Sequence, residues 1–300
     1  MKPWFEKEIL EGDVIKFPEP KEKVIKLPNV STYPDFITGV TDLQARLKQG
    51  QISQDVSALS DGESSWSFLL NPDGKISCWF RINRITTEKY LLDMDAGWGQ
   101  RALDRLVRFK LRVQCEIELV DLPMLSIRGD GANKLKEESH KAEIVADAEW
   151  PRLEGFDLLG DSIQMPAKCN EGKSEEYKFL RIWSGIPCMG SELDEKIIPA
   201  ETNLVDRSVS FTKGCYTGQE LVARVDSRGN NVPKHMRRIS SAGVFDVGSE
   251  IEIDGKTIGK ITSALRSDNE TIGLGFISRS FEPPGEAKTD GITVSIESVS

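Results

Sequence analysis

Apolar residues in the first third of the chain recur in short runs that predict β-strands. Runs at residues 66–70 and 75–80 flank the sequence Asn-Pro-Asp-Gly at 71–74. These turn residues predict a pair of antiparallel strands. Further strands are predicted at residues 89–93 and 111–120. The pattern therefore indicates a small sheet in this part of the chain.

Apolar residues at helical spacing predict a helix over residues 99–110, between the last two of these strands. A shorter helix is expected from Thr41 to Gly50, because glycine commonly ends a helix. Beyond residue 122, a strand at 125–128 and a polar helix from about residue 133 to 139 begin a second unit of mixed helices and strands.

The two ends of the chain differ from this middle part in their pattern of amino-acid types. Residues 1–34 carry five of the fourteen prolines, which predicts an extended arm with short edge strands such as 24–27. In residues 240–300, eight glycines punctuate short apolar runs. Short strands with glycine turns are typical of a small antiparallel barrel or sandwich, and the change in texture places its start at about residue 234.

Composition limits the classes of function. The 300 residues suffice for two or three domains, and the net charge of −9 argues against a dedicated nucleic-acid-binding protein. The N-terminus has no apolar signal core, and no stretch approaches the roughly 20 apolar residues of a membrane span. We therefore expect a cytoplasmic protein whose partners include neither nucleic acid nor membrane.

The five cysteines form no C-x-x-C pair, and the chain has only two histidines. This spacing predicts neither a zinc site nor a four-cysteine cluster site within the chain. Widely spaced cysteines suit a reducing compartment. If iron is involved, we expect this chain to supply one ligand and a partner to supply the others.

One motif carries the clearest chemistry, the run Lys213-Gly214-Cys215-Tyr216-Thr217-Gly218-Gln219-Glu220. Thr217 and Glu220 have the spacing of a capping box, which predicts a helix that ends near Gly229. Cys215 would then lie before the positive end of a helix and beside Lys213, both of which lower the pKa of a thiol. Two readings of Cys215 stay open, a reactive or metal-ligating thiol and a small buried residue.

The same eight residues, continued by Leu221-Val222-Ala223-Arg224, resemble the K-G-C-Y-x-G-Q-E signature of the YgfZ-type proteins. These are folate-binding relatives of the glycine-cleavage T-protein that assist the assembly or repair of iron–sulfur clusters. Residues 47–56 resemble that family's first conserved block, and residues 181–187 resemble the R-x-x-x-G-x-P block of the superfamily. The resemblance extends from about Val30 to the C-terminus.

The resemblance implies an α+β, three-domain T-protein-like fold around a central, folate-sized cavity. After the arm of residues 1–34, the domains would be α+β domain 1 at 35–121, α+β domain 2 at 122–233 and a C-terminal β-barrel at 234–300. Domain 2 would end in the cysteine motif. We expect a monomeric or weakly associating protein.

The resemblance also implies tetrahydrofolate as a cofactor. Arg181, Glu192 and Glu201 are then the polar candidates for folate contacts, although ordinary surface salt bridges are the usual fate of such residues. Trp183, with Trp79 and Tyr216, could stack on a pterin or fill the core.

T-proteins carry an aspartate pair just after a glycine turn, and alignment on Gly74 puts Ser77 and Cys78 at those positions. Neither side chain carries an aspartate's negative charge at neutral pH, which argues against aminomethyl transfer. A cluster of basic residues follows the motif and could attract a folate tail or an acidic partner, or form a solvated face. It comprises Arg224, Arg228, Lys234, Arg237 and Arg238.

Three hypotheses follow. The first is a folate-binding accessory protein for iron–sulfur proteins, in which Cys215 and Lys213 do the chemistry and a cluster is bound only transiently or with a carrier or client protein. The second is a tetrahydrofolate-dependent methyl or aminomethyl transferase with an unusual acid. The third is a non-catalytic interaction module with an inert thiol.

Overall fold

The structure is a computed structural model, and it describes residues 23–26, 35–40, 50–109, 116–138, 141–166, 169–267 and 270–299. Most of the expected N-terminal arm, the helix expected from Thr41 and the residue Cys115 lie outside these ranges. Among the described helices, none has the length and apolar character that a membrane span requires.

The first sheet is antiparallel, with the strand order β3-β4-β5-β2-β6. Its strands are β2 (Asp35–Val40), β3 (Ser64–Leu70), β4 (Ile76–Arg84), β5 (Lys89–Met94) and β6 (Glu116–Val120). The Gly74 N–H donates to the Asn71 carbonyl over 2.8 Å, which confirms the predicted turn. Helix α3 (Gly99–Arg108) packs on this sheet through buried Ala102 and Leu106.

The second sheet has the order β10-β1-β7-β9-β8. Its strands are β1 (Lys23–Lys26), β7 (Met124–Arg128), β8 (Ile144–Asp147), β9 (Gly155–Leu159) and β10 (Asn170–Glu171). The expectation that residues 24–27 form an edge strand is wrong, because β1 pairs with β7 on one side and with β10 on the other. The earliest described strand of the chain thus completes a sheet that is otherwise built from much later residues.

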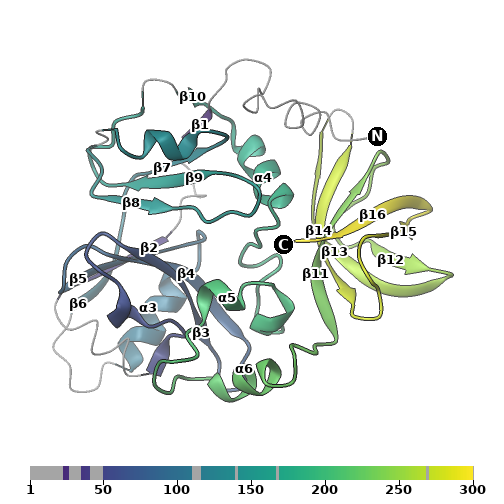
Figure 1. The fold of residues 1–300 in the computed structure, drawn as a ribbon, viewed down its shortest axis with the longest axis horizontal. Coiled ribbons are helices and arrows are strands. Elements are labelled where there is room, and N and C mark those ends of the chain that lie inside the picture. Colours follow the sequence, from purple (N-terminus) through teal and green to yellow (C-terminus); the bar gives the residue numbers. More distant parts are fainter. Residues whose placement is uncertain are drawn as a thin grey trace.

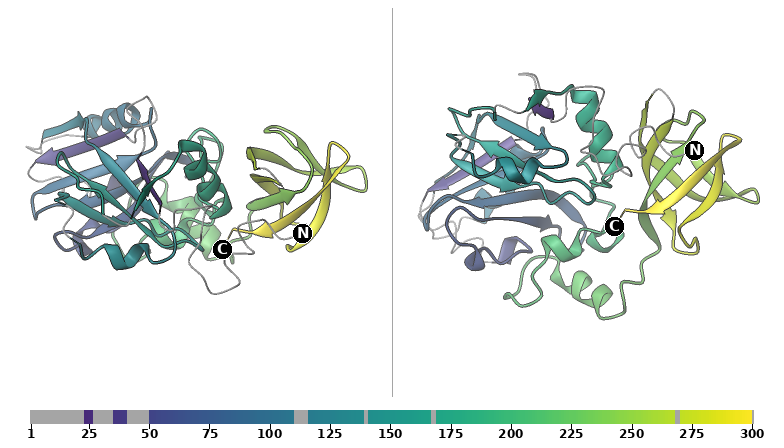
Figure 2. Two further views of the ribbon diagram at one scale, coloured as in Figure 1. Left: turned by 90° about the horizontal axis from the view of Figure 1, so that it is seen from above. Right: turned by 45° about the horizontal axis from the view of Figure 1, so that its top comes forward.

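Three further helices and three 3-10 turns connect the strands in the described ranges. The helices are α4 (Ser174–Trp183), α5 (Val205–Ser208) and α6 (Gln219–Asp226), and the turns are η2 (Val56–Ala58), η3 (Ala132–Leu135) and η4 (Pro199–Glu201). The sequence predicts a polar helix from about residue 133 to 139. In the described part of this segment, the structure has the short 3-10 turn η3 instead. In Figures 1 and 2, α4 lies between the second sheet and the C-terminal strands.

The C-terminal strands close into a six-stranded barrel of order β11-β14-β13-β12-β15-β16. They are β11 (Lys234–Ser241), β12 (Glu250–Ile253), β13 (Lys256–Arg266), β14 (Thr271–Ser278), β15 (Gly285–Thr289) and β16 (Ile292–Ser298). The texture of the sequence left a barrel and a sandwich open, and the structure shows the barrel. Its interior is a separate apolar cluster that includes Ile239, Phe245 and Val294.

One large core joins the three parts. It combines Trp79 of the first sheet, Met124 of the second, Phe179 of α4 and Leu274 of the barrel. Burial of this continuous apolar surface holds the sheets and the barrel together. The observed architecture is therefore α+β, with a C-terminal antiparallel barrel, as expected.

Candidate functional site

Lys213 of the cysteine motif is an anchor in this structure. Its Nζ donates to the carbonyl oxygens of Ile52 over 2.6 Å and of Gln54 over 3.2 Å. It also lies 5.5 Å from the centre of the Tyr216 ring, which is buried in the large core. Burial lowers the pKa of the Lys213 ammonium. The charge of Lys213 is thus directed to the chain before β3.

The predicted capping box of Thr217 and Glu220 is wrong. Helix α6 begins at Gln219, its N-cap is Gly218, and no side chain caps it. The Thr217 N–H donates to the Gly50 carbonyl over 2.7 Å, and its hydroxyl donates to the same oxygen over 3.3 Å. Thr217 therefore fixes the motif to the chain at Gly50 instead of capping the helix.

Gly218 is required by both its backbone and its surroundings. Its φ is +81°, and a β-carbon would lie 2.6 Å from the Asn71 carbonyl oxygen and 2.8 Å from the Leu70 Cβ. The motif thus packs directly on the turn of the first hairpin. Gly214 differs, because a β-carbon there would meet nothing within 4 Å.

We expect Gly218→Ala to lower the free energy of unfolding by roughly 2–4 kcal/mol, because it adds backbone strain and a clash with main-chain atoms. The matched control Gly214→Ala should change it by less than about 0.5 kcal/mol. Urea unfolding of both variants measures the difference. Equal stabilities would show that the hairpin yields to the added methyl group.

Cys215 is exposed at the tip of this anchored segment. Its backbone packs closely on Gly50, where an added β-carbon would lie only 2.6 Å from the Cys215 carbonyl oxygen. Cys78 and Cys169 are buried, and burial raises the pKa of the half-buried Cys188 to about 12. Among the four cysteines in the described ranges, Cys215 is the accessible one.

A central cavity of about 90 Å³ lies between the two sheets and α4. Aromatic rings and charged groups line it, including Trp66, Trp79, Arg81, Asp95, Arg128, Tyr177 and Arg181. The indoles of Trp66 and Trp79 are stacked, with centroids 4.1 Å apart. Burial raises the pKa of the Tyr177 phenol to about 12.

Buried ion pairs cross this cavity from one sheet to the other. Arg81 of β4 contacts Asp93 of β5 over 3.1 Å and Asp157 of β9 over 2.8 Å. Arg128 of β7 contacts Asp157 over 2.8 Å. Two guanidinium groups thus balance two carboxylates, all four of them buried, and Ser126 donates a further hydrogen bond to Asp157 over 2.7 Å.

Asp95 and Arg181 are the other charged groups at the cavity. The Asp95 carboxylate accepts from the Met189 N–H over 2.8 Å, and burial raises its pKa. Arg181 donates to the Ile186 carbonyl over 2.7 Å and to Glu192 over 3.3 Å. Asp95, which follows β5, and Arg181 of α4 therefore bring one acceptor and one donor group to the cavity.

Of the predicted folate contacts, Arg181 and Glu192 form an ion pair over 3.3 Å, but they are not exposed on the same surface. Arg181 lines the central cavity, but Glu192 is fully buried behind it and accepts from Thr262 over 2.8 Å and Ser263 over 2.5 Å of the barrel. Glu201 caps η4 through the Ile198 N–H. The residues predicted as folate contacts thus share no single surface.

The aromatic candidates also divide. Trp79 lines the central cavity, and its indole N–H donates to the Ser208 hydroxyl over 3.0 Å. Trp183 and Tyr216 lie in the large core, and the cavity lining includes neither of them.

Ser77 and Cys78 point away from the central cavity. Ser77 accepts from Arg101 of α3 over 3.3 Å, and Cys78 is buried in the cluster between the first sheet and α3. Asp95 is the carboxylate that sequence reasoning missed. It directly follows β5, and an aspartate at the end of a buried strand could have identified it.

The basic residues after the motif do not form one surface. Arg238 is buried, donates to the Trp183 carbonyl over 3.1 Å and pairs with Glu297. Arg224 is exposed on α6, while Arg237 is half-buried and donates to the Met236 carbonyl. The described residues of this segment therefore do not form a single patch of five cations.

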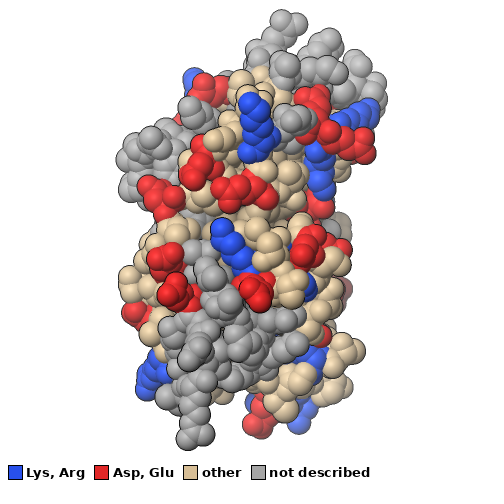
Figure 3. All heavy atoms as spheres, turned by 90° about the vertical axis from the view of Figure 1, so that its left-hand side faces the viewer, with Lys and Arg blue, Asp and Glu red and all other residues tan. Residues whose placement is uncertain are grey.

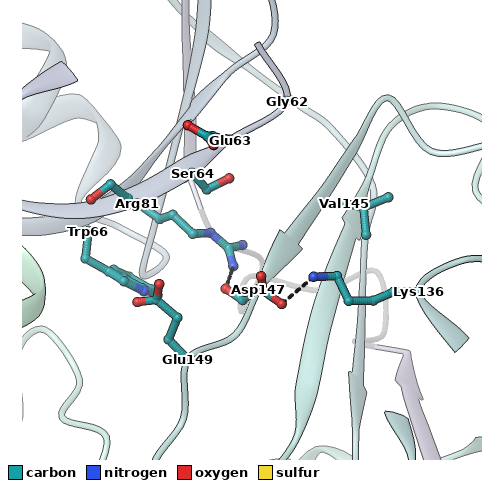
Figure 4. A pocket seen from close by; sticks show the side chains of 10 residues that line it. Gly62, Glu63, Ser64, Trp66, Arg81, Lys136, Val145, Asp147 and Glu149 are labelled. Carbon is teal, nitrogen blue, oxygen red and sulfur yellow. Dashed lines mark hydrogen bonds and ion pairs between the residues drawn. The ribbon is translucent and has the colours of Figure 1, made fainter. Parts of the chain in front are cut away.

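A second hollow, the outer cleft, opens between the start of β3 and β8 and measures about 300 Å³ (Figure 4). Its lining residues are Gly62, Glu63, Ser64, Ser65, Trp66, Arg81, Lys136, Val145, Asp147 and Glu149. Lys136 pairs with Asp147 over 2.6 Å, and Arg81 donates to the Asp147 carbonyl over 3.1 Å. Trp66 and Arg81 also line the central cavity.

Within the described ranges, no three His, Cys, Asp or Glu side chains gather into a metal site. No family model matches the chain. Its curated relatives include an uncharacterized protein of Haemophilus influenzae, 27% identical over 227 residues that cover 73% of this chain and 78% of the relative. The tRNA-modifying protein YgfZ of Escherichia coli O157:H7 is 27% identical over 285 residues, which cover 83% and 85%.

Among solved structures, the chain is similar to the glycine cleavage system aminomethyltransferase T from Bartonella henselae. The TM-score is 0.74 at 15% identity, and the match covers 92% of this chain and 85% of the other. The resemblance inferred from the cysteine motif is thereby confirmed: the chain is a homologue, over most of its length, of proteins named tRNA-modifying protein YgfZ, and it has the fold of the glycine-cleavage T-protein.

Proposed function

We propose that this protein is a folate-binding accessory factor for the assembly or repair of iron–sulfur clusters in client enzymes, with Cys215 as its working thiol. The homology to proteins named YgfZ supports this role at the level of the family. A cluster would be cargo that Cys215 binds together with ligands from a carrier or client protein.

The observation that carries the proposal is the way the motif presents Cys215. Lys213, Tyr216 and Thr217 are tied to the chain before β3 or buried in the core, while Cys215 between them is exposed. A rigid loop with one accessible thiol suits a brief contact with a partner's metal or disulfide.

Folate is the cofactor implied by the fold family, and the chemistry of the central cavity fits its pterin ring. Trp66, Trp79 and Tyr177 offer aromatic faces, and the Asp95 carboxylate can accept from the ring's N–H groups. The Nε–H of Arg128 and the indole N–H of Trp66 are buried, and no described residue accepts from them. A pterin carbonyl or ring nitrogen would satisfy such donors.

The name of the relatives speaks of tRNA modification. For this chain we propose an indirect role in that process, through an iron–sulfur client enzyme. On the described part of the face in Figure 3, basic side chains are interspersed with acidic ones, whereas RNA-binding surfaces concentrate basic residues. The net charge of −9 also disfavours direct RNA binding.

Asp95 favours one alternative function. A buried carboxyl group with a raised pKa at this cavity could act as the unusual acid of a folate-dependent transferase. Steady-state transfer of a one-carbon unit to tetrahydrofolate by the purified protein would establish that alternative.

We expect tetrahydrofolate to bind to the wild-type protein, and Asp95→Asn to weaken binding by roughly tenfold to a hundredfold, because it removes a charge-assisted hydrogen bond. Asparagine can still accept from Met189, so the local backbone should persist. Anaerobic calorimetry measures both dissociation constants. The control Glu88→Gln changes an exposed carboxylate at the β4–β5 turn and should bind like wild type. A wild-type protein that gives neither heat nor a thermal shift would remove folate from the proposal.

A further inference from the structure

The central cavity and the outer cleft are separated by a wall of two side chains. Trp66 and Arg81 line both hollows, one of about 90 Å³ and one of about 300 Å³. Figure 4 shows the Trp66 indole on one side of the outer cleft, next to Glu149, with Lys136 and Val145 opposite. Any path between the hollows at this wall therefore depends on one of these two side chains moving.

Arg81 is fixed on every side. It is 1% exposed, pairs with Asp93 and Asp157, and donates to the Asp147 carbonyl over 3.1 Å. Moving it would leave the buried Asp93 carboxylate without its cationic partner and would leave Asp157 paired with Arg128 alone, which is costly in an interior. Arg81 is thus the stationary half of the wall.

Trp66 is held much less firmly. It lies on β3, an edge strand of the first sheet, and no described residue accepts from its indole N–H. Its partner Trp79 is hydrogen-bonded to Ser208 over 3.0 Å. The stacked pair is therefore asymmetric: a hydrogen bond fixes the Trp79 ring, while packing alone holds the Trp66 ring, against Trp79, the edge of the large core and the Arg81 guanidinium 5.5 Å from its centre.

The volumes of the two hollows show why a ligand would need the Trp66 ring to move. Small-molecule sites usually measure about 300–1,000 Å³, and an engineered cavity that binds benzene measures about 150 Å³. The central cavity, at about 90 Å³, is too small for a two-ring pterin with Trp66 in its present position. The outer cleft alone is large enough but lacks the unpartnered Arg128 Nε–H and the Asp95 carboxylate.

We propose that the outer cleft and the central cavity are two chambers of one binding site, and that a pterin ring enters from the outer cleft and replaces Trp66 on the face of Trp79. This inference rests on the proposed folate function. Once inside, the ring meets Asp95 as acceptor and Arg128 as donor, and the aminobenzoyl part of folate occupies the outer cleft.

The charge of the outer cleft orients the remainder of the ligand. The cleft is lined by three carboxylates, those of Glu63, Asp147 and Glu149, and by one ammonium group, that of Lys136. The charge of Arg81 is balanced within the buried ion pairs. Like charges repel, so the glutamyl carboxylates of the ligand extend past these side chains into solvent.

Trp66→Ala tests the proposal with 5-formyltetrahydrofolate as the probe. If the closed wall keeps the competent state at a few per cent or less, removing the indole should raise the association rate and the affinity about tenfold or more. Trp66→Phe keeps a smaller ring, so its association rate and affinity should lie between those of the wild type and Trp66→Ala. Trp98→Phe, whose ring lies near Arg101 of α3, is the matched control and should bind like wild type. Stopped-flow tryptophan fluorescence measures the rates.

A second measurement needs no variant at the wall. In the wild-type protein labelled with 5-fluorotryptophan, the fluorine resonance of Trp66, assigned through Trp66→Phe, should shift strongly when the probe binds. Probe binding with an unmoved Trp66 resonance, or with an unchanged rate in Trp66→Ala, would overturn the two-chamber site while folate binding stands. No binding to the wild type or to the opened variant would remove both proposals.

Discussion

Cys215→Ser is expected to abolish support of iron–sulfur client enzymes and to leave the unfolding transition of the protein unchanged. Serine has nearly the same size, and the Cys215 side chain is exposed, so no packing is lost. The backbone of the loop is held by Gly50, Lys213 and Thr217, none of which depends on the sulfur atom. A hydroxyl group neither ligates iron as a thiolate does nor attacks a disulfide.

The control for this prediction is Cys188→Ser, since Cys188 is half-buried and burial raises its thiol pKa to about 12. That variant should retain client activity. Iodoacetamide at neutral pH should label Cys215 faster than Cys78, Cys169 or Cys188, as followed by peptide mass spectrometry. Full client activity in a cell that carries only the serine variant of Cys215 would end the thiol hypothesis, and the transferase and interaction-module alternatives would remain.

The parts of the fold that depend on local chemistry could be predicted from the sequence. The turn at residues 71–74 is predicted by its own four residues. The short strands at the C-terminal end are predicted by their apolar runs and glycines, without reference to other segments. The start of α6 could not be predicted in this way. Thr217 bonds to Gly50 and Gly218 packs on Asn71, and both contacts come from segments that are remote in the sequence.

The candidate site was predictable only in part for the same reason. Arg181 and Trp79 are at the cavity, but the role of Glu192 depends on hydroxyl groups of the barrel strand β13. A glutamate in a loop gives no sign of such partners. Arg81 and Asp93 carry a signal in the sequence, because charged residues within apolar strand runs usually pair with each other when buried.

The second large effect is expected at Asp157, where an asparagine should destabilise the fold by about 3–5 kcal/mol, because two buried guanidinium groups would lose their shared carboxylate. Arg81 and Arg128 contact Asp157 from different sheets, each over 2.8 Å. Asp157→Asn should therefore loosen the second sheet from the first as well as lower the unfolding midpoint. Asp73→Asn removes an exposed ion pair with Lys75 and should change the midpoint little.

The pH dependence identifies the cause of that loss. Burial alone would raise the pKa of the Asp157 carboxyl, but Arg128 and Arg81 outweigh it and hold the pKa below its usual value. A carboxyl whose pKa is lower in the folded state stabilises the fold above its unfolded pKa of about 3.9, and this stabilisation is lost as the pH falls through the folded value. Burial raises the pKa of Asp93, but Asp93 is present in both proteins.

The stability gap between wild type and Asp157→Asn, measured by urea unfolding, should therefore stay constant near neutral pH and narrow below about pH 4. A gap that does not narrow in acid would mean that the asparagine acts through packing, and that the carboxylate is not what joins the two sheets.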